Sequence, residues 1–173
     1  MLSKDPRRFG ATVTAHHPWI NEIDVLRGGM STDLHCLPVV KTEDDRLAIR
    51  KAITADNNQH FFLGTDSAPH PMLKKKRVHR AAGGIFTDHA GIELYAHIFD
   101  EENALRNLET FASINGAKFY GFSPNRHYMT LEKVPWTVDE LIGINGSLQD
   151  DIWPFLFEIE PAERKPISWR IVE

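Results

Sequence analysis

The fold is decided by the stretch His60-Phe61-Phe62-Leu63-Gly64-Thr65-Asp66-Ser67-Ala68-Pro69-His70. A short apolar run bounded by Gly and Pro is typical of a strand buried on both faces, as in parallel α/β sheets. Asp66 then follows the carboxyl end of that strand, where α/β barrels and open α/β sheets hold ligands, metals and catalytic side chains. An Asp-Ser pair after a strand also caps simple turns. Because Pro69 stiffens the backbone beside His70, the stretch favours a binding or catalytic loop.

Composition limits the class of protein. The chain has 173 residues, 42% of them hydrophobic, and a net charge of −4, which indicates one soluble globular domain. That charge gives no electrostatic reason to expect nucleic acid or a membrane surface as a partner. The single cysteine, Cys36, excludes an internal disulfide framework and a cysteine-cluster zinc site. Residues 1–8 contain no apolar signal segment and no run is long enough to span a membrane, so we expect a cytoplasmic protein.

The first half of the chain has the pattern of a parallel β-α-β unit. The β-branched segment Ala11–His16 predicts a strand, which an irregular connection through Gly28-Gly29 follows. Thr42 is placed as the N-cap of a helix, with Asp45 at the third helical position. That helix leads into the strand before Asp66. The two strands are therefore expected to lie parallel.

The second half predicts helices and then an extension. The basic run Lys74–Arg77 is most simply a solvated surface. Apolar residues between Ile92 and Phe99 recur at helical spacing and predict a core-facing helix. A second helix is expected from Ala104, with a break at Asn115-Gly116, and a later strand over Tyr128–Glu132.

Four segments of the chain matter together, and they are Leu34–Lys41, Phe62–His70, Ile98–Leu105 and Phe119–Gly121. Taken in order, they resemble the C-terminal part of class II dihydroorotases, which are zinc-dependent cyclic amidases of the amidohydrolase superfamily. The resemblance implies the α/β fold of a TIM-type (β/α)8 barrel, present here only in its C-terminal portion. Residues 11–122 would supply the last two β-α units and residues 123–173 a C-terminal extension, so that residues 1–173 form a single partial domain.

The resemblance also implies roles for individual residues. Asp66 matches the acid that binds one zinc ion and serves as general base, a role suited to a carboxylate beside a metal-activated water. His70 matches the residue that holds the substrate carboxylate. Leu37 and Gly83 match positions whose backbone groups contact the pyrimidine ring. The substrates implied are dihydroorotate and N-carbamoyl-aspartate, in pyrimidine biosynthesis.

The remaining histidines and the cysteine are expected to be structural. His17 aligns with a histidine common in the family, yet we expect it and His16 to pack or to support ligands rather than to bind metal directly. Cys36 is more simply a small buried hydrophobic residue than a nucleophile. No His-x-His or His-Glu-x-x-His spacing occurs among the nine histidines. Structural roles are also expected for His35, His60, His79, His89, His97 and His127.

The chain departs from the family in two ways. Thr32-Asp33 stands where family members usually show Pro-His. More seriously, a barrel typically needs about 250 residues, and the family's His-x-His pair, carboxylated lysine and two further histidine ligands belong to earlier strands. We therefore expect a fragment of a longer enzyme, one piece of a split enzyme completed by an N-terminal half, or an inactive remnant. The full-length enzyme would be a homodimer.

Taken alone, the chain is predicted to be inactive and to retain no stoichiometric zinc, because Asp66 is a single ligand. A non-catalytic subunit is the alternative from another class. A hydantoinase-like cyclic amidase is the alternative among enzymes, although the Ala68-Pro69-His70 continuation and the segment around Leu37 fit dihydroorotase better.

Overall fold

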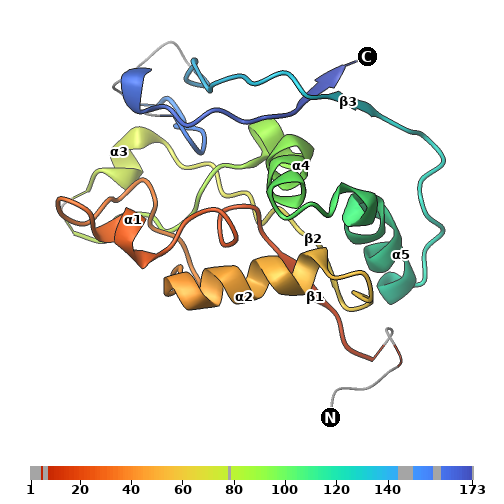
Figure 1. Cartoon of the computed structure of the whole chain (residues 1–173). Helices are drawn as coiled ribbons and strands as arrows, with labels where there is room; N and C mark the ends of the chain where they lie inside the picture. The colour runs from red at the N-terminus through yellow and green to blue at the C-terminus, as the bar shows by residue number, and fades with distance from the viewer. Residues whose placement is uncertain (1–4, 6–7, 78, 144–149, 158–160, 173) are drawn as a thin grey trace.

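A computed structural model describes residues 5, 8–77, 79–143, 150–157 and 161–172. At its centre lie two parallel strands, β1 (Ala11–Val13) and β2 (Phe61–Leu63), joined by helix α2 (Glu43–Thr54) (Figure 1). The register pairs Ala11 with Phe61 and Val13 with Leu63. The predicted parallel β-α-β unit is confirmed, although both strands are shorter than the segments that predicted them.

Helix α2 begins where the capping pattern predicted. The Thr42 hydroxyl accepts a hydrogen bond from the backbone N–H of Asp45 at 3.3 Å, and the Asp45 carboxylate accepts one from the backbone N–H of Thr42 at 3.3 Å. This reciprocal capping box satisfies two N–H groups that would otherwise have no partner. The start of α2 is therefore encoded locally.

The other elements surround this unit. In Figure 1, α2 and β1 lie at the same height in the lower part of the molecule, α4 lies above them, and β3 and β4 form a separate antiparallel pair at the top. The elements outside the β1-α2-β2 unit are α1 (Glu22–Leu26), α3 (Met72–Lys75), α4 (Gly91–Glu101), α5 (Asn115–Tyr120), β3 (Thr130–Glu132), β4 (Arg170–Val172), 3-10 turns at Asp88–Ala90, Leu105–Asn107 and Pro161–Glu163, and a π-helical turn at Thr110–Ile114.

The core lies between the strands and α4. Phe62 is buried, whereas Phe61 and Leu63 are half-buried, so only the middle residue of β2 is fully enclosed by the described chain. Tyr95 and Phe99 of α4 are fully buried, which confirms the predicted core-facing stripe. None of the helices in the described ranges is long and apolar enough to cross a membrane.

The structure corrects two expectations about helices. The connection through Gly28-Gly29 contains a short helix, α1, capped by Asn21. No break occurs at Asn115-Gly116, because the π-helical turn runs directly into α5 there. The buried Asn115 amide donates to the carbonyls of Asn58 and Phe61, each at 3.1 Å. Asn115 therefore does not end the helix but holds the chain that enters β2 through these two hydrogen bonds.

The basic run Lys74–Arg77 is also not the uniform solvated surface that was predicted. Lys75 is buried, with 6% of its surface exposed, while its neighbours Lys74 and Lys76 are exposed. The Lys75 ammonium donates to the backbone carbonyls of His35 at 3.1 Å and Gly84 at 2.6 Å. This lysine therefore links two loops of the site described below.

Candidate active-site edge

The carboxyl ends of β1 and β2 lie side by side, and the candidate site is built on this edge. Since Val13 pairs with Leu63, the segments after the two strands start from neighbouring points. The buried Tyr95 hydroxyl donates to the carbonyl of Val13 at 2.7 Å and lies 3.5 Å from the carbonyl of Gly64. Tyr95 was expected only as a core residue, and it also holds the two strand ends together.

Asp66 is exposed at this edge, and its backbone has a φ of 42°, which is unusual for a residue with a side chain. Both of its neighbours are anchored. The Thr87 hydroxyl donates to the carbonyl of Thr65 at 3.3 Å, and the Ser67 hydroxyl accepts from the backbone N–H groups of Thr87 at 3.1 Å and Asp88 at 3.2 Å. Such contacts can hold a strained backbone in place, as at many functional sites. The carboxylate is thus presented from a fixed position.

Two histidines and a cysteine lie near Asp66. The rings of His16 and His17 are 4.7 Å apart, and His16, His17 and Cys36 each offer a ligand atom within 4.8 Å of the others. Burial and the charge of Lys41 lower the pKa of His17, while the negative charge of Asp66 acts to raise it. Cys36 is buried, as predicted, and this burial raises the pKa of its thiol.

The sequence did not predict that these three residues meet. One signal was available, because His16-His17 ends the first predicted strand and therefore belongs to the same edge as Asp66. The position of Cys36 had no such signal, since it depends on how the loop before α2 returns to the edge.

The three residues expected to bind substrate come from neighbouring loops. A Cβ added at Gly83 would lie 3.3 Å from Cγ of Leu37, and one added at Gly84 would lie 3.1 Å from Cδ2 of His70. The backbone N–H of Gly84 donates to the carbonyl of His35 at 2.9 Å. Leu37 is strongly exposed and His70 is half-buried. The structure therefore brings Leu37, Gly83 and His70 to one surface.

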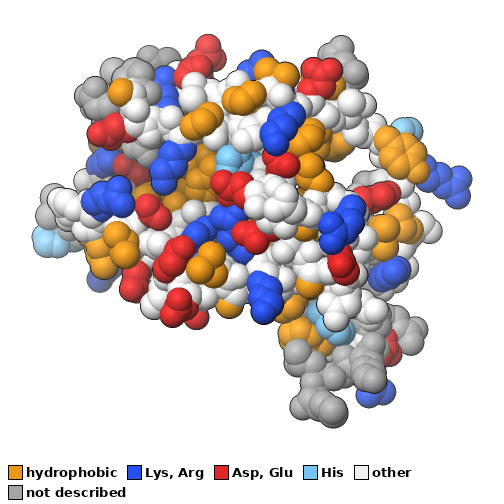
Figure 2. Space-filling view, in the orientation of Figure 1, with side chains coloured by type: hydrophobic (Ala, Val, Ile, Leu, Met, Phe, Trp, Pro, Cys, Tyr) orange, Lys and Arg blue, Asp and Glu red, His pale blue; other side chains and the backbone are white. Residues whose placement is uncertain are grey.

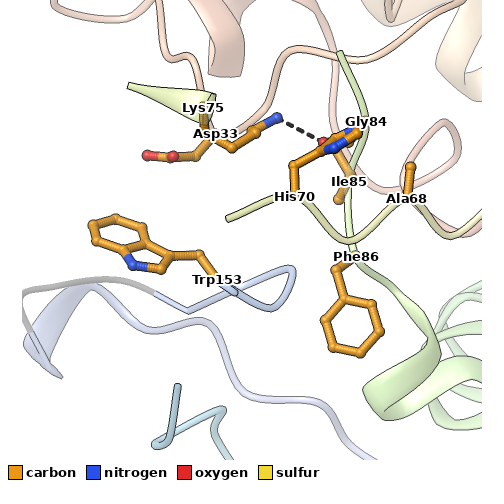
Figure 3. Close-up of a pocket in the computed structure, with 8 residues that line it drawn as sticks. All are labelled: Asp33, Ala68, His70, Lys75, Gly84, Ile85, Phe86 and Trp153. Carbon is orange, nitrogen blue, oxygen red and sulfur yellow. Dashed lines mark hydrogen bonds between the residues drawn. The ribbon is translucent and has the colours of Figure 1, made fainter. Parts of the chain in front are cut away.

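Lys75 lies beneath this surface, and Figure 3 shows its bond to Gly84 next to His70. Burial lowers the pKa of Lys75 to about 8, and the charge of Asp33 acts to raise it. The pocket drawn in Figure 3 also includes Trp153, and its volume is about 10 Å³. That volume holds about one water molecule, so within the described chain His70 is packed and does not line a substrate-sized cavity.

A larger groove, of about 470 Å³, contains none of the predicted site residues. Trp19, Arg46, His97 and Glu101 are among its lining residues. The face shown in Figure 2 carries acidic and basic side chains close to one another, and Arg46 pairs with Glu43 at 2.6 Å. These charges are largely paired, so the groove offers no clear charge selectivity.

Parallel strands with an acid and imidazoles at their carboxyl edge place the chain in the α/β class whose ligand sites lie at that edge. No family model matches the chain. It is 49% identical over 128 residues to the dihydroorotase of Azoarcus sp. (strain BH72), covering 74% of this chain and 37% of that protein. It is 41% identical over 166 residues to the dihydroorotase of Methylobacillus flagellatus, covering 96% of this chain and 45% of that protein.

Solved structures agree with the sequence matches. The fold is similar to dihydroorotase from Saccharomyces cerevisiae in complex with 5-fluoroorotic acid, with a TM-score of 0.80, 28% identity, and coverage of 98% of this chain and 45% of that one. For dihydroorotase from Campylobacter jejuni the TM-score is 0.74 at 25% identity, over 95% of this chain and 44% of that one. By sequence and by fold the chain is related to the dihydroorotases, and it spans less than half the length of these relatives. The resemblance found in the sequence is confirmed.

Proposed function

We propose that the chain is the C-terminal part of a dihydroorotase, contributing the last two β-α units of a (β/α)8 barrel (residues 11–122) and a C-terminal extension (residues 123–173). The observation that carries the proposal is the parallel pair β1–β2 with Asp66 and His70 at its carboxyl edge. The relatives named dihydroorotase support it at 41–49% identity. The reaction would be the reversible hydrolysis of dihydroorotate to N-carbamoyl-aspartate in pyrimidine biosynthesis, in which water adds across a ring C–N bond.

Asp66 would bind zinc and move the proton. Its carboxylate is exposed at the edge and its backbone is anchored on both sides, as a ligand that must not swing away requires. When bound, zinc would polarise the scissile carbonyl and lower the pKa of a water molecule. Asp66 would take the proton of that water and return it to the leaving ring nitrogen, which is the two-way transfer that a reversible reaction needs.

His70, Leu37 and Gly83 would bind the substrate. Leu37 and Gly83 present backbone groups from adjoining loops, and the His70 imidazole can donate to a carboxylate. The pocket beside His70 is too small for a pyrimidine ring, so the binding cavity would form only when further strands close against this edge.

Asp66 cannot hold zinc alone, and two parallel strands cannot close a barrel. The other strands would come from an upstream part of the same protein or from a complementing N-terminal half, and the complete enzyme would be a homodimer. We place it in the cytoplasm, in keeping with one buried thiol, Cys36.

A complementation assay tests this function. The chain would be co-expressed with the part of the Azoarcus sp. dihydroorotase that lies outside the match, and dihydroorotate hydrolysis would be measured with zinc. We expect turnover only when both parts are present, loss of turnover in Asp66→Asn, and retention in His79→Ala, an exposed control. Turnover by the chain alone, or by complemented Asp66→Asn, would contradict the proposal.

A second substrate tests the role of His70. Dihydrouracil has the ring of dihydroorotate without its carboxylate, so His70→Ala should raise KM for dihydroorotate and leave dihydrouracil hydrolysis unchanged. Preference of the complemented enzyme for dihydrouracil would instead indicate a hydantoinase-like amidase.

A further inference from the structure

Three metal-binding side chains converge after β1 without the help of Asp66. His16 and His17 come from the segment that leaves β1, and Cys36 comes from the loop before α2. Their ligand atoms lie within 4.8 Å of one another. In tetrahedral zinc sites, donors at 2.0–2.3 Å from the metal are roughly 3.3–3.7 Å apart. A contraction of about 1 Å, within the reach of side-chain rotation, would bring the three to that spacing.

The second observation is a buried nitrogen without a partner. His16 is 2% exposed, and its Nδ1 has no hydrogen-bond partner among the described residues. Its other ring nitrogen, Nε2, lies 3.3 Å from the Thr14 hydroxyl. Buried polar atoms normally have a partner, and an orphaned one points to a group that is missing. Burial lowers the pKa of His16 to about 3, so the imidazole is neutral and its lone pair is available.

We propose that His16, His17 and Cys36 form a binding site for one zinc ion or a similar borderline divalent transition metal. Two imidazoles and one thiol are the donor types that zinc prefers over oxygen-only ligands. On binding, the Cys36 S–H bond breaks, its proton goes to solvent and the sulfur electron pair forms the bond to the metal. Three protein ligands leave a fourth position open, as in catalytic zinc sites.

The surrounding charges are mixed. The positive charge of Lys75 near His16 and that of Lys41 near His17 both disfavour added positive charge at the site. The negative charge of Asp66 near His17 and Cys36 favours added positive charge there. Because the thiolate neutralises one of the two metal charges, the net increase at the site is one unit, against which Asp66 supplies one negative charge.

Cobalt binding to the metal-free 173-residue chain tests the proposal. Titration with Co²⁺ should produce a thiolate-to-cobalt charge-transfer band in the near ultraviolet and the intense visible bands of tetrahedral cobalt, both removed by Zn²⁺. Equilibrium dialysis against Zn²⁺ alone should give one ion per chain, in place of the absence of stoichiometric zinc that Asp66 as a single ligand predicts. Cys36→Ser should abolish the charge-transfer band. His17→Gln should weaken binding by more than about 100-fold, since even loss of a group that only hydrogen-bonds to a metal ligand and orients it costs about 10–100-fold.

Two controls separate this site from others. His79→Ala removes an exposed histidine and should leave the titration unchanged. Asp66→Asn should keep the charge-transfer band, whereas it should abolish turnover in the complementation assay, so the two proposals can fail independently.

A cobalt spectrum without thiolate bands in the wild-type chain would overturn the proposal. So would wild-type affinity in folded His17→Gln, with folding checked by circular dichroism.

Discussion

Replacing Gly84 with alanine should loosen the loop that carries Asp66 and His70. Gly84 has a φ of +153°, a backbone conformation that residues with side chains rarely adopt. A Cβ at this position would lie 2.5 Å from Cβ of Ala68, 3.1 Å from the carbonyl oxygen of Ala68 and 3.1 Å from Cδ2 of His70. The first distance is far below van der Waals contact, so Ala68 or the backbone of Gly84 must move.

The magnitude follows from two terms. Overpacking a well-filled site costs about 1–3 kcal/mol, and an unfavourable backbone conformation costs about 1–3 kcal/mol. Because movement of the loop relieves part of each, we expect Gly84→Ala to lower the free energy of unfolding by about 3 kcal/mol. For a chain of this size, 1 kcal/mol shifts Tm by about 2–4 °C, so Tm should fall by roughly 6–12 °C.

Urea denaturation followed by tryptophan fluorescence measures this loss, and a double-mutant cycle identifies its cause. Ala68→Gly removes the atom that is 2.5 Å away, so Gly84→Ala should cost about 1–2 kcal/mol less in that background. Gly91→Ala is the control, because nothing lies within 4 Å of its added Cβ. Unchanged stability in Gly84→Ala, or an equal loss with and without Ala68→Gly, would refute the steric argument.

Three further predictions concern stability. Thr42→Ala removes the capping hydroxyl of α2 and should lower the free energy of unfolding by about 1 kcal/mol in urea denaturation. Tyr95→Phe removes the hydrogen bond to the Val13 carbonyl and should lower the free energy of unfolding by about 1–2 kcal/mol, measured as a lower Tm. An unchanged or higher Tm would speak against this bond. Burial lowers the pKa of His89 from 6.5 to about 4, so the unfolded chain takes up a proton in that window while the folded chain does not, and stability falls as the pH drops through it. His89→Leu should flatten this fall when urea midpoints at pH 7 and pH 4.5 are compared; an unchanged slope would contradict the assignment.

The sequence predicted what nearby residues determine. The start of α2 depends on Thr42 and Asp45, which are three residues apart, and the structure confirms it. The place of Asp66 after a parallel strand follows from the apolar run before it and from the helix between the strands. Neither inference requires knowledge of how distant segments pack.

What the sequence did not predict depends on distant carbonyl groups and loops. Lys75 is buried because it meets the carbonyl of His35, forty residues earlier in the chain, and nothing in a run of basic residues indicates which one turns inward. Asn115 continues a helix because its amide reaches Asn58 and Phe61. The meeting of Cys36 with two histidines near the end of β1 has the same origin.

The edge is held by contacts that do not depend on further strands. Within the described residues β1 and β2 pair only with each other, and a two-stranded parallel sheet is weak by itself. Tyr95 nevertheless joins the strand ends, Ser67 binds the turn at Asp88, and Lys75 bridges two loops. Each of these bonds comes from the helical side or from a neighbouring loop. Strands that pair with the outer sides of β1 and β2 would therefore complete the sheet without changing these bonds. The position of Asp66 should therefore be set before a complementing part binds, and complementation should add ligands and a cavity to an edge that is already formed.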